Sequence, residues 1–198
     1  QKDKGFRASK SRNKAIAKSN GDYIILIDGD MILHPEFIRD HAINSELGCF
    51  VQGGRVLLSH SKTSKMIENQ KINLSFTDFG LKNRKNSIHS SLLSRYLSVK
   101  RNYLKGIKTC NLAFFKKDCI AINGFNNDFE GWGREDSEFS LRLMNSGIER
   151  KTLKFNAIQF HLWHHESSKN SLKINDEIMQ KTINKNLSWC ENGINNYL

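Results

Sequence analysis

Short apolar runs alternate with longer stretches of mixed polarity along this chain. Runs at residues 23–28, 50–51, 56–58, 111–115 and 154–162 predict strands, because aliphatic and aromatic residues are concentrated in them. The first run is uninterrupted, which is typical of a strand buried on both faces of a sheet.

The stretches between these runs carry helix signals. Helices are predicted at residues 6–19, 35–48, 118–122, 135–146 and 172–189, and in part of the polar segment 63–105. Pro35 suits the first turn of its helix, and Gly147 is a typical stop signal.

The alternation of strands and helices predicts one α/β domain over residues 1–198, because no internal repeat or linker interrupts it. A doubly wound nucleotide-binding sheet ordinarily opens with a strand, whereas this sequence opens with a predicted helix. We therefore expect that N-terminal strands of the sheet are missing from it.

Composition narrows the class of protein. With 38% hydrophobic and 26% charged residues, the chain is neither disordered nor membrane-spanning, since no apolar run approaches the ~20 residues of a spanning helix. The four cysteines, at positions 49, 110, 119 and 190, form no Cys-x-x-Cys pair. This spacing favours reduced thiols in a cytoplasmic protein.

Positive charge is distributed unevenly. The net charge is +11, and residues 79–117 contain ten Lys or Arg residues and no Asp or Glu. Such a surface attracts phosphates, anionic lipid headgroups, acidic glycans or nucleic acid. Ordinary solvated surface charge is the alternative interpretation.

Two carboxylates follow the first apolar run, in the sequence Asp28-Gly29-Asp30. They point the same way if the strand continues through them, unless a turn begins at Gly29. In both cases they lie at the strand end where open α/β sheets bind ligands, and they could bind Mn²⁺ or Mg²⁺. The simpler alternative is an Asp-Gly turn.

A second acidic cluster opens a predicted helix, in the octet at residues 131–138 with the sequence Gly-Trp-Gly-Arg-Glu-Asp-Ser-Glu. A helix N-terminus alone favours acidic residues. It does not explain Trp132 between two glycines, one of them Gly133. A mobile sugar-stacking loop that delivers a general base, Glu135 or Asp136, explains the whole octet.

Three histidines, at positions 161, 164 and 165, follow the last predicted strand. Imidazole together with carboxylate is a common ligand set for Mn²⁺. His161 and His164 cannot share one face of a regular strand, so we expect one of them to have another role. Arg12 and Asn13, on the first helix, either contact a nucleotide or lie on the surface.

These motifs, in this order, resemble the family-2 glycosyltransferases of GT-A fold, in particular their chondroitin-polymerase-like bacterial branch. They are also similar to the C-terminal motif of animal β-1,4-galactosyltransferases. The matching pieces are residues 5–13, 28–30, 123–125, 131–138 and 160–170. The resemblance implies a GT-A, Rossmann-like mixed sheet flanked by helices, here without the family's N-terminal donor-binding strands.

The resemblance also implies roles for individual residues. Asp30 would bind Mn²⁺ on the nucleotide diphosphate, with Asp28 facing the ribose or the groups around the metal. His164 would be the late metal ligand, with His161 as the alternative. Trp132 would belong to a loop that closes over the donor.

In the same octet, the resemblance implies that Glu135 contacts the acceptor and that Asp136 removes its proton. The implied reaction is inverting transfer from a UDP-sugar to a glycan or lipid-linked glycan in surface polysaccharide synthesis, with Mn²⁺ or Mg²⁺. The location would be cytoplasmic, with residues 79–117 touching the inner membrane and no nucleic-acid partner. The rival hypotheses are a metal-dependent phosphohydrolase and a non-catalytic basic module that binds glycan or membrane.

Overall fold

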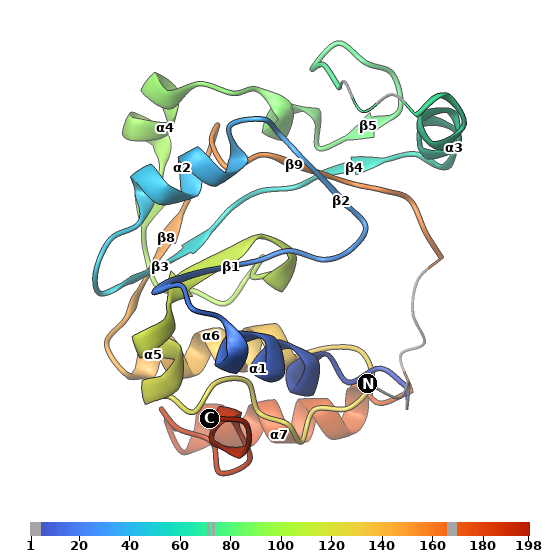
Figure 1. Ribbon diagram of the computed structural model, residues 1–198. Helices are drawn as coiled ribbons and strands as arrows, with labels where there is room; N and C mark the ends of the chain where they lie inside the picture. The colour runs from blue at the N-terminus through green and yellow to red at the C-terminus, as the bar shows by residue number, and fades with distance from the viewer. Residues whose placement is uncertain (1–4, 71, 73, 166–169) are drawn as a thin grey trace.

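Two mixed β-sheets organise the computed structural model, which describes residues 5–70, 72, 74–165 and 170–198 (Figure 1). The predicted segment 160–170 therefore falls partly outside the described residues. The five-stranded sheet has the order β1 (Tyr23–Leu26), β7 (Leu112–Phe115), β3 (Cys49–Gln52), β8 (Glu149–Thr152) and β6 (Val99–Lys100). The four-stranded sheet has the order β2 (Met31–Leu33), β9 (Gln159–His161), β4 (Val56–Leu58) and β5 (Leu81–Lys82).

Both sheets contain parallel and antiparallel neighbours. Strands β3 and β8 are parallel, as are β4 and β9, whereas β1 and β7 run antiparallel. The helices are α1 (Ala8–Lys18), α2 (Phe37–Asn44), α3 (His60–Asn69), α4 (Ser91–Leu97), α5 (Lys116–Ala121), α6 (Glu135–Asn145) and α7 (Leu172–Asn184), with 3₁₀ turns η1 (Arg84–Ser87), η2 (Thr109–Asn111) and η3 (Ile194–Asn196). The predicted α/β class, with mixed strands flanked by helices, is confirmed.

The chain crosses repeatedly from one sheet to the other. Strand β1 leads to β2, β3 leads to β4, and β8 leads to β9, and in each pair the first strand belongs to the five-stranded sheet and the second to the four-stranded sheet. The three connections, at residues 27–30, 53–55 and 153–158, therefore meet along one boundary, which we call the seam. The candidate site lies there.

The central strands of the five-stranded sheet are covered on both faces. Phe50 and Phe114 belong to a core cluster with Phe139 of α6, whereas their neighbours Val51 and Ala113 pack on the opposite face with Phe37 of α2. This alternation follows the two-residue period of a strand. Figure 1 shows α1, α6 and α7 below this sheet and α2 above it.

The edge position of β1 corrects one prediction. The run at 23–28 was expected to be buried on both faces, but the strand ends at Leu26 and its four residues are only half-buried. Within the described residues, β1 pairs with β7 alone. An edge strand of this kind keeps part of its surface accessible although its sequence is continuously apolar.

Backbone conformation explains where the other predicted boundaries were wrong. The strand expected at 154–162 is confined to β9, because Phe155 and Ala157 adopt φ angles of 63° and 51° that no regular strand contains. The last helix ends at Asn184 rather than near 189, and Asn186 follows with φ of 47°. The polar strand β8 and the short strand β2 were missed.

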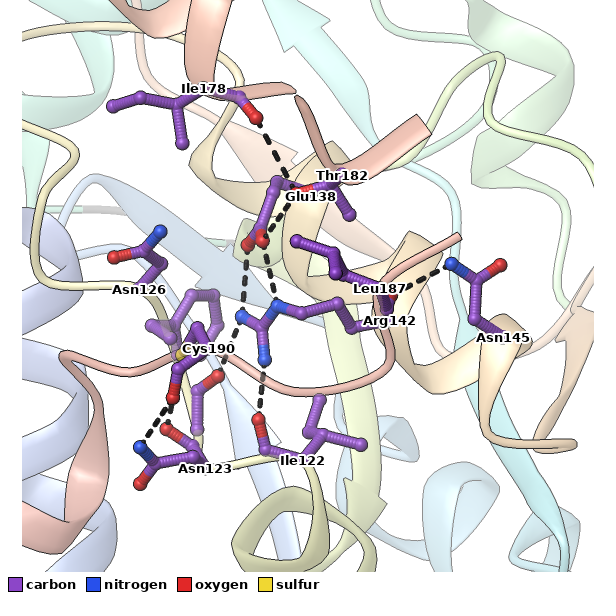
Figure 2. A network of polar contacts seen from close by, with 12 residues as sticks. Ile122, Asn123, Asn126, Glu138, Arg142, Asn145, Ile178, Thr182, Leu187 and Cys190 are labelled. Carbon is purple, nitrogen blue, oxygen red and sulfur yellow. Dashed lines mark hydrogen bonds and ion pairs between the residues drawn. The ribbon is translucent and has the colours of Figure 1, made fainter. Parts of the chain in front are cut away.

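A buried ion pair fixes helix α6 (Figure 2). Arg142 is fully buried and donates from Nε and Nη2 to the two carboxylate oxygens of Glu138, at 2.7 and 2.9 Å. Its remaining donors reach the carbonyl oxygens of Ile122 and Gly124 at 2.6 and 2.8 Å, and Thr182 of α7 donates to Glu138 at 3.1 Å. The network joins α6, α7 and the loop after α5.

Glu138→Gln should lower the free energy of unfolding by about 3–5 kcal/mol, because it leaves the buried Arg142 charge without its partner. Glu177→Gln, the same change at an exposed position of α7, should alter it by less than about 0.5 kcal/mol. Urea denaturation of both variants measures the difference. Equal stabilities would show that the pair does not hold α6 in place.

Candidate functional site

The turn after β1 places the first acidic motif on the seam. The strand ends at Leu26 and a turn occupies Gly29 and Asp30, so the strand does not continue through the motif. Strand β2 then begins beside β9, and the Asp30 carbonyl accepts a hydrogen bond from Leu162 at 3.0 Å. Asp30 therefore lies next to the end of β9, where the histidines follow.

Asp30, His161 and His164 form a compact cluster. Nε2 of His161 lies 3.1 Å and Nε2 of His164 lies 3.0 Å from Oδ2 of Asp30, and the three ligand atoms lie within 4.8 Å of one another. Oδ1 of Asp30 is buried and has no hydrogen-bond partner among the described residues. Such an orphaned oxygen beside two imidazoles fits a divalent cation.

The ligand chemistry of the cluster distinguishes among cations. One carboxylate with two imidazoles suits Mn²⁺ and other transition metals, whereas Mg²⁺ prefers oxygen ligands alone. Burial lowers the pKa of His161, although the nearby Asp30 charge opposes that effect. A lowered pKa keeps the imidazole neutral, which is the form that binds a metal.

Both histidines reach the same carboxylate, so the expectation that they separate is corrected. Strand β9 ends at His161, and the next residues have no regular strand pairing. The alternation of a strand therefore no longer governs where His164 points. The rings lie 5.0 Å apart, and His164 is the more exposed of the two.

Arg12 connects the first acidic motif with the second. Its Nη1 lies 3.2 Å from Oε1 of Glu135, and its Nη2 lies 3.6 Å from Oδ1 of Asp28. The guanidinium also sits over the ring of Phe125, 5.4 Å from its centre. Helix α1 thus brings a cation between two carboxylates that are separated by 107 positions in the sequence.

Asp136 has the electrostatic character of a proton acceptor. Burial, and then the charge of Glu135, raise its pKa from 3.8 to about 6. The backbone N–H of Ser137 donates to Oδ1 of Asp136 at 2.7 Å and partly opposes this shift. A carboxylate with a pKa near 6 is ionised at neutral pH and is a better base than an ordinary aspartate.

The glycines around Trp132 are packed rather than loose. Gly131 and Gly133 have φ angles of +72° and +107°, and a Cβ on Gly131 would lie 2.3 Å from Oγ of Ser171. Asn175 of α7 donates to the carbonyl of Gly133 at 2.9 Å. The indole itself is 42% exposed. The glycines therefore permit an unusual backbone and a close approach to α7, where flexible flanks were expected.

Asn13 does not line the site. Its side chain is fully buried, and Nδ2 donates to the carbonyl of Phe125 at 2.7 Å and to Oδ1 of Asn127 at 3.0 Å. Both amide hydrogens are therefore occupied, and Oδ1 accepts from the backbone of Phe125. The residue shapes the loop below Arg12 and has no free donor for a nucleotide.

Two residues of the seam were not identified from the sequence. Asn111 donates to the carbonyls of Gly54 and Ala157 at 2.7 and 2.8 Å, which joins two of the three connections. Arg55 ends the second connection, and its Nη1 lies 4.0 Å from Sγ of Cys110. The glycine pair before Arg55 was a usable signal, whereas nothing marked Asn111 within its apolar run.

Known families match most of the chain. Residues 1–111 match the family described as glycosyl transferase family 2, and residues 89–166 match the one described as the N-terminal domain of galactosyltransferase. The first match covers more than half of the 198 residues and contains Arg12, Asp28 and Asp30. The second contains the tryptophan octet and both clustered histidines.

A curated relative is similar over much of the same region. The chain is 26% identical to the hyaluronan synthase of Pasteurella multocida over 168 residues, which cover 77% of this chain and 17% of that protein. The chain thus spans about one sixth of the length of this relative. From the match over residues 1–111, the chain belongs to glycosyl transferase family 2.

Proposed function

We propose that this domain transfers a sugar from a UDP-sugar to a hydroxyl of a glycan or lipid-linked glycan, with inversion at the anomeric carbon. The observation that carries the proposal is the convergence of Asp30, His161 and His164 at the seam, where Asp28 is linked through Arg12 to Glu135, the neighbour of Asp136. Family membership and the similarity to a hyaluronan synthase support a role in polysaccharide synthesis.

Asp30, His161 and His164 would hold the metal, for which we propose Mn²⁺ with Mg²⁺ as the alternative. When bound there, the ion would supply Lewis-acid stabilisation of the departing diphosphate. The two imidazoles favour Mn²⁺ over Mg²⁺. Asp28, which is half-exposed and already faces Arg12, remains available to the ribose of the donor.

Asp136 would accept the proton of the acceptor hydroxyl as that oxygen attacks the anomeric carbon, while Glu135 would contact the acceptor. The C–O bond to the diphosphate breaks on the opposite face, as in inverting glycoside hydrolysis with a hydroxyl in place of water. The raised pKa of Asp136 suits this task. The exposed ring of Trp132, with Gly133 beside it, would stack on a sugar.

The rival hypotheses have less support from the residues. A two-metal phosphohydrolase needs a second ion about 3.5–4 Å from the first, and no second cluster of suitable ligands occurs among the described residues. A purely non-catalytic basic module would not account for the raised pKa of Asp136 beside Trp132.

Loss of either clustered histidine should weaken Mn²⁺ binding. We expect His161→Ala and His164→Ala each to reduce Mn²⁺ affinity by at least about tenfold, because each removes one ligand of a small set. Electron paramagnetic resonance of free Mn²⁺ measures the affinity directly. His165→Ala is the control, because it removes a neighbouring imidazole outside the cluster, and it should bind Mn²⁺ like the wild type. Equal Mn²⁺ affinities in all three variants would contradict the proposed metal site.

Asp136→Asn should reduce turnover by about 10²–10⁴-fold, the usual contribution of a general base, while UDP binding stays nearly unchanged. In the wild type, kcat/KM should rise with pH through the pKa of about 6, since ionised Asp136 is the active form. Radiolabelled sugar transfer measures both effects. Asp22→Asn is the control, because Asp22 is exposed and lies at the opposite end of β1, and its turnover should equal that of the wild type. Unchanged turnover in Asp136→Asn would exclude Asp136 as the base.

We also propose that residues 79–117 contact an anionic membrane at the cytoplasmic side, where lipid-linked acceptors would lie. Leu92 and Tyr96 of α4 are 67% and 74% exposed, and Arg95 lies between them. Neither Arg95 nor Arg101 forms an ion pair with a described carboxylate. No helix in the described part of the chain is long and apolar enough to cross a bilayer, so such a contact would be peripheral.

Arg95→Ala combined with Arg101→Ala should weaken binding to phosphatidylglycerol vesicles by about thirtyfold. Each basic residue near an anionic surface contributes about 1 kcal/mol to binding. Vesicle co-sedimentation measures the loss. Lys173→Ala with Lys181→Ala makes the same charge change on α7, at the opposite end of Figure 1, and should have little effect. Equal loss in both double variants would mean that only net charge matters.

A further inference from the structure

Arg55 is a half-buried cation on the seam, and it has no role in the reaction proposed above. It follows Gly53 and Gly54 at the end of β3 and directly precedes β4. Its position, between a strand of one sheet and a strand of the other, therefore corresponds to that of Asp28 and Asp30 on the connection from β1 to β2. The direction of its side chain and the groups around it indicate what it could bind.

The chain around Arg55 lies beside the metal-ligand cluster. Strands β4 and β9 are parallel, with Leu57 opposite His161. Val56 and Phe160 point into an apolar core cluster on one face. Because side chains alternate along a strand, Leu57 and His161 share the other face. Arg55 directly precedes β4 and lies close enough to His161 for its charge to act on that ring.

The tip of Arg55 reaches towards the first acidic motif. Its Nη1 lies 4.0 Å from Sγ of Cys110 in η2. The next strand, β7, begins at Leu112, which pairs with Leu26, two positions before Asp28. The guanidinium therefore lies close to η2, whose Cys110 thiol is affected by the charges of both Arg55 and Asp28. Its charge also contributes to lowering the pKa of His161, after burial as the main cause.

Arg55 differs from Arg12 in having no carboxylate partner. Arg12 contacts both Asp28 and Glu135, whereas no described carboxylate lies within 4.0 Å of Arg55. Among the described residues, its side chain makes the weak sulfur contact with Cys110 and no other hydrogen bond or ion pair. A guanidinium has five donors, and one that is partly removed from water without an acceptor is unfavourable. This arrangement suits an anion that arrives with the substrate.

We propose that Arg55 binds a phosphate oxygen of the donor's diphosphate, next to the Asp30, His161 and His164 cluster. This rests on the proposed function. The bond from the anomeric carbon to the diphosphate oxygen breaks with its electron pair on that oxygen, so the departing diphosphate gains one negative charge. A divalent ion in the cluster, less the one negative charge of Asp30, would leave a single positive charge against the diphosphate. Arg55 would supply a further positive charge without a proton transfer.

Binding of UDP to purified wild-type and variant protein, measured by titration calorimetry with saturating Mn²⁺, tests the role of Arg55. Arg55→Ala should weaken UDP binding by about ten- to a hundredfold, the usual effect of losing a charged hydrogen bond. Arg55→Lys should restore part of the loss, because it keeps the charge but not the fork of donors. Arg39→Ala, at an exposed arginine of α2, should bind UDP like the wild type.

Further measurements separate the possible explanations. Mn²⁺ affinity by paramagnetic resonance and the thermal unfolding midpoint should be unchanged in Arg55→Lys, which excludes loss of the metal site or of folding. Inorganic pyrophosphate should compete with UDP more weakly in Arg55→Ala, whereas uridine, which lacks phosphate, should bind both proteins equally. A carboxylate-bearing sugar is the other anion that a guanidinium binds well, and glucuronate serves as its probe.

Equal UDP affinity in wild type and Arg55→Ala would overturn the role of Arg55 while leaving the transferase proposal intact. Loss of glucuronate binding with UDP binding unchanged would also overturn it, and would assign the residue to an acidic sugar. Failure of the wild type itself to bind UDP would overturn the proposed function together with this inference.

Discussion

The side chain of Asn111 joins two of the connections that form the seam between the two sheets. Its amide nitrogen bonds to the carbonyls of Gly54 and Ala157, and its oxygen accepts from Nε2 of His41 at 2.9 Å. Burial lowers the pKa of His41 to about 4, so this ring is neutral and can keep its tautomer. A Cβ on Gly53 would lie 2.4 Å from Asn111, which explains the glycine. Without these contacts, the connections that carry Arg55 and lead into β9 would be free to separate.

The four carboxylates of the candidate site have different environments, which make them chemically different. Asp28 and Glu135 share the charge of Arg12. Asp30 faces two imidazoles instead of a permanent cation. Asp136 forms no ion pair with a described residue, and burial and the charge of Glu135 raise its pKa to about 6. One acid therefore becomes suitable as a base while its neighbours remain suitable as ligands.

The sequence predicted those features that depend on local pattern. The strand start at Tyr23 and the helix start at Glu135 follow from apolar periodicity and from an acidic first turn, and both were located correctly. The pairing of His161 with His164 depends on where β9 ends, which no pattern in the sequence revealed. Arg55 was overlooked because its importance arises only when three distant connections meet.

The proposed base and the proposed metal ligands are held by different parts of the structure. Asp136 lies on α6, which is fixed by the Glu138–Arg142 pair. The ring of Phe139 on the same helix packs against Phe114 of the five-stranded sheet, with the ring centres 5.1 Å apart. The cluster of Asp30, His161 and His164 lies where the four-stranded sheet meets the seam. Arg12 makes a polar link between the two parts, and its longer contact, 3.6 Å to Asp28, is with a half-exposed carboxylate. Such a contact is weak in water, so a substrate that binds both parts can adjust their spacing without breaking a buried interaction.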